Sequence, residues 1–207
     1  MDKILVIFKF EKDFYEKYLG RTDKVTFIGH PLTDRIASSY YYESRKPKRT
    51  LKYIAILPGS RVNEISKILN ELITTAVKFL KIHREYKIII SAADTSKIAL
   101  IRKYLPADSR FLIVCGNTYS IIQNAECVLV SSGTATLETG IIGAPMIAVY
   151  KVNYITGLLA RLVIKIKNIA LINIVLGKTV VKEFLQNSLK SDLVLNELLK
   201  IIENDEY

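Results

Sequence analysis

The chain has 207 residues, of which 50% are hydrophobic and 24% charged, a composition typical of a globular protein. The absence of an uncharged apolar stretch of about 20 residues argues against a membrane-spanning helix. Lys and Arg outnumber Asp and Glu by 30 to 20, so the net charge of +10 favours an anionic partner: nucleic acid, anionic lipid or a phosphorylated substrate. The two cysteines, Cys115 and Cys127, lie in apolar surroundings without a CxxC pair, and His30 is far from His83, so we expect buried, reduced thiols and no metal site.

The first part of the chain has no cleavage site typical of a signal peptide. Its sequence pattern predicts two short strands and a helix. Apolar runs and helically spaced aromatic residues predict strands over 3–8 and 25–28 and a helix over 10–19. A tyrosine-rich, basic stretch around Pro47 follows, and this composition is typical of a linker. We therefore expect a domain boundary with a linker over residues 35–50.

The next part of the chain alternates regularly between strand and helix patterns. The expected strands cover 51–57, 87–91, 111–114, 127–130 and 146–149, and the expected helices cover 63–84, 96–104, 118–124 and 134–142. Further helices are expected over 154–166, 180–186 and 191–203. Apolar, β-branched strands that alternate with helices predict an α/β fold with a parallel sheet covered on both faces.

Unusual residues follow the first of these strands, at a place where open α/β sheets bind ligands. In the sequence Leu-Pro-Gly-Ser-Arg over 57–61, Gly59 allows a ligand to approach the backbone closely. Ser60 can donate a hydrogen bond, and the guanidinium of Arg61 suits phosphate oxygens. An ordinary strand-to-helix turn with a serine cap and a solvated arginine explains the same residues equally well.

A second group of polar and small residues follows the strand at 127–130. Ser132, Gly133 and Thr134 open a helix, where unpaired backbone N–H groups and the helix dipole attract an anion. Glu138 lies one turn beyond Thr134 on the same face and can accept hydrogen bonds from the two hydroxyls of a ribose. A capped helix with a solvated glutamate is the alternative. Together the two motifs predict a nucleoside diphosphate site, whereas no Walker A, GxGxxG, GxSxG or catalytic-triad pattern is present.

Four segments in order resemble the lipid-A-disaccharide synthase family: 10–15, 27–32, 57–61 and 132–138. Asn173 and the stretch 177–186 continue the resemblance, which covers nearly the whole chain. It implies the Rossmann-like C-terminal half of a GT-B glycosyltransferase. The implied reaction is an inverting transfer of 2,3-diacylglucosamine from UDP to 2,3-diacylglucosamine 1-phosphate in lipid A biosynthesis. It implies no metal and no other cofactor, because helix N-termini and basic side chains neutralise the diphosphate.

The resemblance also assigns residues and domains. It implies that Arg61, with Gly59 and Ser60, and the turn at Ser132, Gly133 and Thr134 meet the diphosphate, and that Glu138 holds the ribose. Three further residues match positions that line the same cleft: Asn173, Glu183 and Gln186. The implied domains are a remnant of the acceptor domain over 1–34, the UDP-sugar-binding domain over 51–190 and a truncated C-terminal helix over 191–207. The catalytic base is implied in an N-terminal half that this chain lacks, so little or no activity is expected from this chain alone. A separate N-terminal half chain or a second copy of this chain is an expected partner.

A basic amphipathic helix is predicted over 154–166, with leucines on one side and Arg161 and Lys165 beside them. Such a helix can lie on an anionic membrane surface, although a core helix with snorkelling cations fits the same pattern. Since the implied substrates are lipids, we expect a cytoplasmic protein at the inner membrane of a Gram-negative bacterium.

Two other functions remain open from the sequence. One is another GT-B enzyme, either a UDP-GlcNAc transferase or an epimerase. The other is a non-catalytic basic module that binds lipid or nucleic acid. Nucleic acid is not expected, because the tyrosines at 40–42 near Arg45 are its sole aromatic indication and single-strand binders usually carry more stacking residues.

Overall fold

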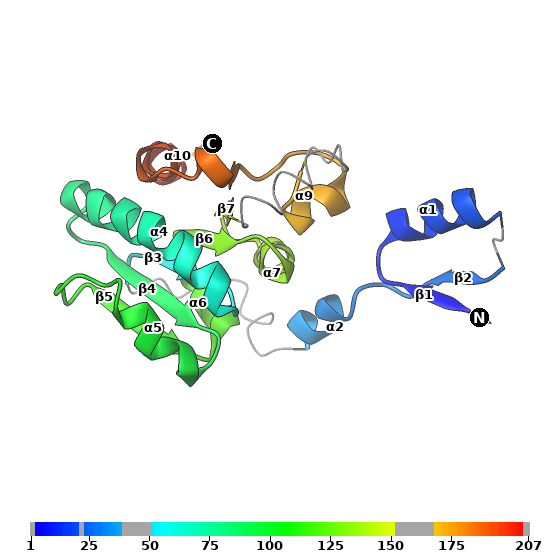
Figure 1. Ribbon diagram of the computed structural model, residues 1–207, viewed down its shortest axis with the longest axis horizontal. Helices are drawn as coiled ribbons and strands as arrows, with labels where there is room; N and C mark the ends of the chain where they lie inside the picture. The colour runs from blue at the N-terminus through cyan, green and yellow to red at the C-terminus, as the bar shows by residue number, and fades with distance from the viewer. Residues whose placement is uncertain (1–2, 21–22, 39–50, 152–167, 205–207) are drawn as a thin grey trace. The chain divides into compact units, whose positions relative to one another are not determined.

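The computed structural model describes residues 3–20, 23–38, 51–151 and 168–204, and the chain divides into two units, Met1–Arg45 and Lys46–Tyr207 (Figure 1). The elements of the first unit are β1 (Ile4–Val6), α1 (Lys9–Leu19), β2 (Val25–Phe27) and α2 (Pro31–Ala37). β1 and β2 pair in parallel. The two predicted strands and the helix between them are confirmed, whereas α2 was not predicted.

The sequence Gly-His-Pro over 29–31, which follows β2, leads into α2. The ring nitrogen Nδ1 of His30 accepts a hydrogen bond from the backbone N–H of Leu32 at 3.1 Å and caps the helix. Pro31 suits the first helical position, where no N–H is needed. Because α2 runs to Ala37, the domain boundary predicted after residue 34 falls inside a helix. Most of the predicted linker lies outside the described residues and stays a prediction.

The first unit leaves several large apolar side chains exposed. Leu5 in β1 is 61% exposed, Phe14 in α1 is 55% exposed and Ile28 after β2 is 55% exposed. Parallel sheets are normally covered on both faces, and a two-stranded sheet is marginally stable alone. The described residues of this unit bury some apolar side chains, such as Val6 and Val25, but leave other large ones exposed.

The second unit is built on a six-stranded parallel sheet with strand order β5-β4-β3-β6-β7-β8. Its strands are β3 (Tyr53–Leu57), β4 (Lys87–Ala92), β5 (Phe111–Cys115), β6 (Cys127–Ser131), β7 (Met146–Tyr150) and β8 (Glu183–Leu185). The chain runs outward from β3 to β5, returns to β6 beside β3, and then runs outward to β8 on the other side. The strand order therefore reverses between β3 and β6, where doubly wound sheets form a ligand crevice.

Helices cover both faces of this sheet, as the alternation in sequence predicts (Figure 1). They are α4 (Val62–Ile82), η1 (Thr95–Lys97), α5 (Ile98–Arg102), α6 (Thr118–Asn124), α7 (Thr134–Ile142), α9 (Leu171–Leu176), η2 (Gln186–Ser188) and α10 (Ser191–Glu203). Ile54 and Ile56 of β3 pack into one core cluster with α4 and α10. Ala55 and Leu57 pack into a second cluster with residues of α6. This alternation with a period of two buries β3 on both faces and confirms the predicted α/β fold.

Two predictions from sequence are wrong in the second unit, and one helix was missed. Residues 180–186 do not form a helix, because Phe184 is buried in the core from the short strand β8 and η2 follows. The helix α9 was not predicted. Cys115 is exposed at the end of the edge strand β5, whereas Cys127 is buried as expected, and burial raises the pKa of its thiol far above the usual value.

The basic helix predicted over 154–166 lies outside the described residues, so a contact with an anionic membrane surface stays a prediction. In the ranges that the structure does describe, no helix combines the length and apolar character needed to cross a bilayer.

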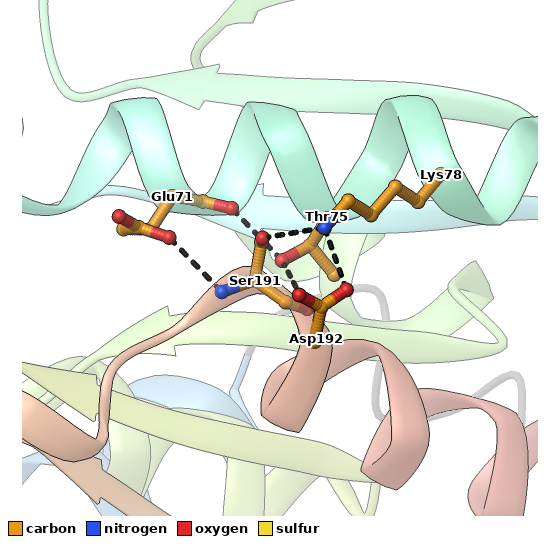
Figure 2. Close-up of polar contacts among 5 residues, drawn as sticks. All are labelled: Glu71, Thr75, Lys78, Ser191 and Asp192. Carbon is orange, nitrogen blue, oxygen red and sulfur yellow. Dashed lines mark hydrogen bonds and ion pairs between the residues drawn. The ribbon is translucent and has the colours of Figure 1, made fainter.

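Polar contacts fasten α10 to α4 (Figure 2). The carboxylate of Glu71 accepts a hydrogen bond from the backbone N–H of Ser191 at 2.9 Å. The ammonium of Lys78 donates to Ser191 Oγ at 3.0 Å and to Asp192 Oδ1 at 2.6 Å. The residue before the helix, Lys190, forms no side-chain cap. Glu71 therefore supplies from α4 the acceptor that the first turn of α10 otherwise lacks.

Replacing Glu71 with alanine is expected to lower the free energy of unfolding by about 1–2 kcal/mol, as loss of a helix cap does. Urea denaturation measures this change. The control is Glu85→Ala, since Glu85 is exposed and its ion pair with His83 is long at 3.8 Å, and it should cost less than about 0.5 kcal/mol. Equal effects of the two substitutions would contradict the capping role.

Candidate functional site

A pocket of about 350 Å³ opens at the carboxyl ends of β3 and β6, where the strand order reverses. Seven of the ten predicted site residues line it, and they come from both motifs: Gly59, Ser60, Arg61, Ser132, Gly133, Thr134 and Glu138. Ser91 at the end of β4 and Thr118 at the start of α6 complete one wall. The parallel sheet thus brings together two motifs that lie more than 70 residues apart in sequence.

The turn between β6 and α7 leaves the start of a helix open to this pocket. Gly133 has φ 148° and ψ −155°, a backbone conformation that is essentially restricted to glycine. A Cβ atom built on Gly133 would have no atom within 4 Å, so open space lies in front of the helix. Thr134, the first residue of α7, is exposed. The N–H groups of this first turn can therefore meet an anion.

Glu138 lies one turn into α7 and lines the same pocket. Its Oε1 atom accepts a hydrogen bond from the hydroxyl of Tyr119 in α6 at 3.1 Å. The carboxylate is half-buried, so it can be reached by a ligand while its side chain is partly enclosed. The N–H groups at Thr134 and the carboxylate of Glu138, which can accept from hydroxyls, therefore lie on the same face of α7, as their spacing in sequence predicts.

The turn between β3 and α4 forms the opposite wall. Arg61 has an 80% exposed side chain, and its Nη1 atom lies 2.8 Å from Oε1 of Glu64. Gly59 has φ +97°, and a Cβ atom there would come within 2.6 Å of the second Glu64 oxygen. Glycine at 59 is therefore favoured by its positive φ, and a Cβ there would also make the carboxylate of Glu64 move. A guanidinium carries five N–H donors, so Arg61 can bind an anion in addition to Glu64.

Sequence reasoning missed Glu64, which lines the pocket, and Tyr119, which contacts Glu138. Glu64 follows Arg61 by three residues at the start of a helix, which is a spacing that pairs opposite charges and is the signal for this contact. Tyr119 lies in a different helix from Glu138, and no local pattern indicates their contact.

Asn173 and Glu183 are not among the residues that line the pocket. Asn173 is fully buried, and its amide donates to Glu183 Oε1 at 2.7 Å and accepts from the backbone N–H groups of Val180 and Val181 at 2.9 and 3.0 Å. These contacts hold the backbone just before β8. In this structure Asn173 therefore has a packing role.

The Asn173–Glu183 pair reaches the pocket indirectly. The second oxygen of Glu183 accepts from the backbone N–H of Ile169 at 2.8 Å, and the carbonyl of Ile169 accepts from Ser132 Oγ at 3.1 Å. Gln186 starts η2 with a positive φ of 52° and also does not line the pocket. Contact of these three residues with a ligand stays a prediction. Within the described ranges, no group of three or more His, Cys, Asp or Glu side chains is placed to hold a metal ion.

Comparison with known proteins gives a family match over the full length. A family model described as lipid-A-disaccharide synthetase matches residues 1–207. Lipid-A-disaccharide synthase of Anaeromyxobacter dehalogenans strain 2CP-1 is 32% identical over 209 residues, covering 98% of this chain and 53% of the relative. The Acinetobacter baylyi enzyme is 32% identical over 222 residues, covering 99% of this chain and 55% of the relative. The chain therefore spans about half the length of the curated relatives it matches.

Solved structures similar to this chain include GT-B glycosyltransferases and epimerases. The Methanocaldococcus jannaschii UDP-GlcNAc 2-epimerase, in complex with UDP-GlcNAc and UDP, has a TM-score of 0.63 at 14% identity, covering 100% of this chain and 56% of that chain. A putative UDP-N-acetylglucosamine 2-epimerase from Listeria monocytogenes has a TM-score of 0.67 at 11% identity, with 99% and 52% covered. Identities this low show the fold alone, which is that of the C-terminal half of a GT-B enzyme. The family match over all 207 residues adds the assignment that the chain belongs to the lipid-A-disaccharide synthetase family of glycosyltransferases.

Proposed function

We propose that this chain supplies the UDP-sugar site of a lipid-A-disaccharide synthase. The pocket at the switch point supports this proposal, because one hollow combines the open start of α7, the guanidinium of Arg61 and the carboxylate of Glu138. The diphosphate would accept hydrogen bonds from the turn at Gly133 and Thr134 and from Arg61. The ribose hydroxyls would donate to Glu138. The volume of about 350 Å³ lies within the usual range for small-molecule sites.

The proposed reaction is the transfer of 2,3-diacylglucosamine from UDP to 2,3-diacylglucosamine 1-phosphate, with inversion at the sugar carbon, in lipid A biosynthesis. Negative charge develops on the departing diphosphate as the bond between the sugar and UDP breaks. The N–H dipoles at the start of α7 and the guanidinium of Arg61, both at the pocket, would stabilise this charge more in the transition state than in the bound donor. The family match favours this transferase reaction over the epimerase alternative.

The acceptor site and the catalytic base are proposed to come from the part of the relatives that this chain does not match. Two observations support this division of labour. The chain covers 53% of the length of its A. dehalogenans relative, and the first unit exposes apolar side chains on a two-stranded parallel sheet. Additional strands and helices would bury Leu5, Phe14 and Ile28 and would complete this sheet.

Calorimetric titration of the purified chain with UDP tests the proposed function. We expect one UDP to bind per chain, and Arg61→Ala should weaken binding by about 10-fold, the loss of one charge-assisted hydrogen bond. The same preparation, given donor and acceptor lipids, is expected to form little or no disaccharide. A chain that binds no UDP would refute the donor site, and rapid disaccharide formation would refute the division between two halves.

A further inference from the structure

The hydrogen bond between Tyr119 and Glu138 joins two helices that stand beside the pocket. Tyr119 lies in the first turn of α6 and Glu138 lies in the middle of α7, and these helices pack against each other. The phenol hydroxyl donates to Oε1 of Glu138 at 3.1 Å. Among the residues that the structure describes, Glu138 has no other hydrogen-bond or ion-pair partner.

Tyr119 itself does not line the pocket, whereas its neighbour Thr118 and its partner Glu138 do. A ligand in the pocket would therefore contact Glu138 and not Tyr119. The phenol therefore reaches the pocket through the carboxylate of Glu138.

A glutamate side chain has three rotatable bonds, and fixing them on ligand binding costs conformational entropy. The ring of Tyr119 is half-buried and has few rotamers, so its hydroxyl is a fixed point for Oε1. An ionised carboxylate offers about four lone-pair positions, so one bond to the phenol leaves room for two ligand hydroxyls. The arrangement holds the carboxylate in one orientation before a ligand arrives.

We propose that Tyr119 is a positioning residue that orients Glu138 toward the vicinal hydroxyls of the ribose. This inference rests on the proposed UDP site. It adds to that site a residue that belongs to neither of the two sequence motifs. It assigns the selectivity for a ribose with both hydroxyls to a pair of side chains, one from α6 and one from α7.

The test compares two nucleotides on Tyr119→Phe, a change that keeps the ring and removes the hydroxyl. Affinity for UDP is expected to fall by about 5- to 10-fold, because a carboxylate that the phenol no longer holds must lose rotamer freedom when it binds the ribose. Affinity for 2′,3′-dideoxy-UDP, which lacks the hydroxyls that Glu138 would accept, should stay within about 2-fold. A purely structural role would lower both affinities equally.

Two further variants separate the possible outcomes. Tyr104→Phe, which changes a tyrosine outside this pocket, should leave both affinities unchanged. In a Glu138→Gln background, Tyr119→Phe should cost less for UDP than it does in the wild type. Equal losses for both nucleotides, or no loss for UDP, would overturn the inference while the UDP site stands. Failure of the wild-type chain to bind UDP would overturn the proposed function and this inference together.

Discussion

Replacing Glu138 with alanine is expected to weaken UDP binding by about 100-fold. The carboxylate would accept two hydrogen bonds from the ribose, and each bond to a charged group contributes about 1.5–3 kcal/mol. A combined loss near 3 kcal/mol corresponds to about two orders of magnitude in the dissociation constant. Calorimetric titration of both proteins with UDP measures this change.

The nature of the lost contact can be checked with a smaller ligand. Inorganic diphosphate has no ribose, so Glu138→Ala removes no direct contact with it. The affinity of the variant for diphosphate should therefore differ from that of the wild type by less than about 2-fold. Glu85→Ala, which removes an exposed carboxylate at the far end of α4 from the pocket, should leave UDP affinity unchanged. If Glu138→Ala weakened diphosphate as much as UDP, the assignment of Glu138 to the ribose would be wrong.

Replacing Gly133 with alanine is expected to reduce UDP affinity by at least about 10-fold and to destabilise the fold by about 1–3 kcal/mol. Any side chain at φ 148° and ψ −155° is strained, so the turn should relax and turn its N–H groups away from the pocket. A Cβ there meets no protein atom within 4 Å, so the methyl group would also stand in the space of the anion. Titration with UDP and urea denaturation report the two effects.

Gly143→Ala provides the matched control for Gly133. Gly143 caps the other end of the same helix with φ 83°, so alanine is strained there too, but Gly143 does not line the pocket. The Gly143→Ala variant should therefore be less stable than the wild type but bind UDP with the same affinity. Loss of affinity in both variants would indicate that general destabilisation, and not the open start of α7, explains the result.

The core of the second unit was predictable because local patterns and global fold agree there. The helix over 134–142 has the bounds expected from sequence, since Gly133 and Gly143 mark its two ends and small residues open it. β3 is apolar along its whole length, which is typical of a strand buried on both faces. The predicted residues that line the pocket lie within α7, just before it or just after β3, so the local patterns that predict these two elements also place the residues at one edge of the sheet.

The parts that sequence did not predict depend on contacts between distant residues. β8 is three residues long, too short for a periodic signal, and it forms because Phe184 enters the core and β7 offers a parallel edge. Asn173 holds the approach to β8 through four hydrogen bonds, which no local pattern reveals. The bond from Tyr119 to Glu138 similarly depends on how α6 packs on α7.

Nuclear magnetic resonance of the ¹⁵N-labelled chain during addition of UDP tests the central claim most directly. A diphosphate held at the start of α7 changes the shielding of the amide protons that bind it, so the largest shifts should come from Gly133, Thr134 and Gly59. The opposite end of the sheet carries a second hollow, lined by Met146 and Ile172, whose amides should not move. Shifts concentrated around Met146, with the amide of Gly133 unmoved at saturating UDP, would contradict the account.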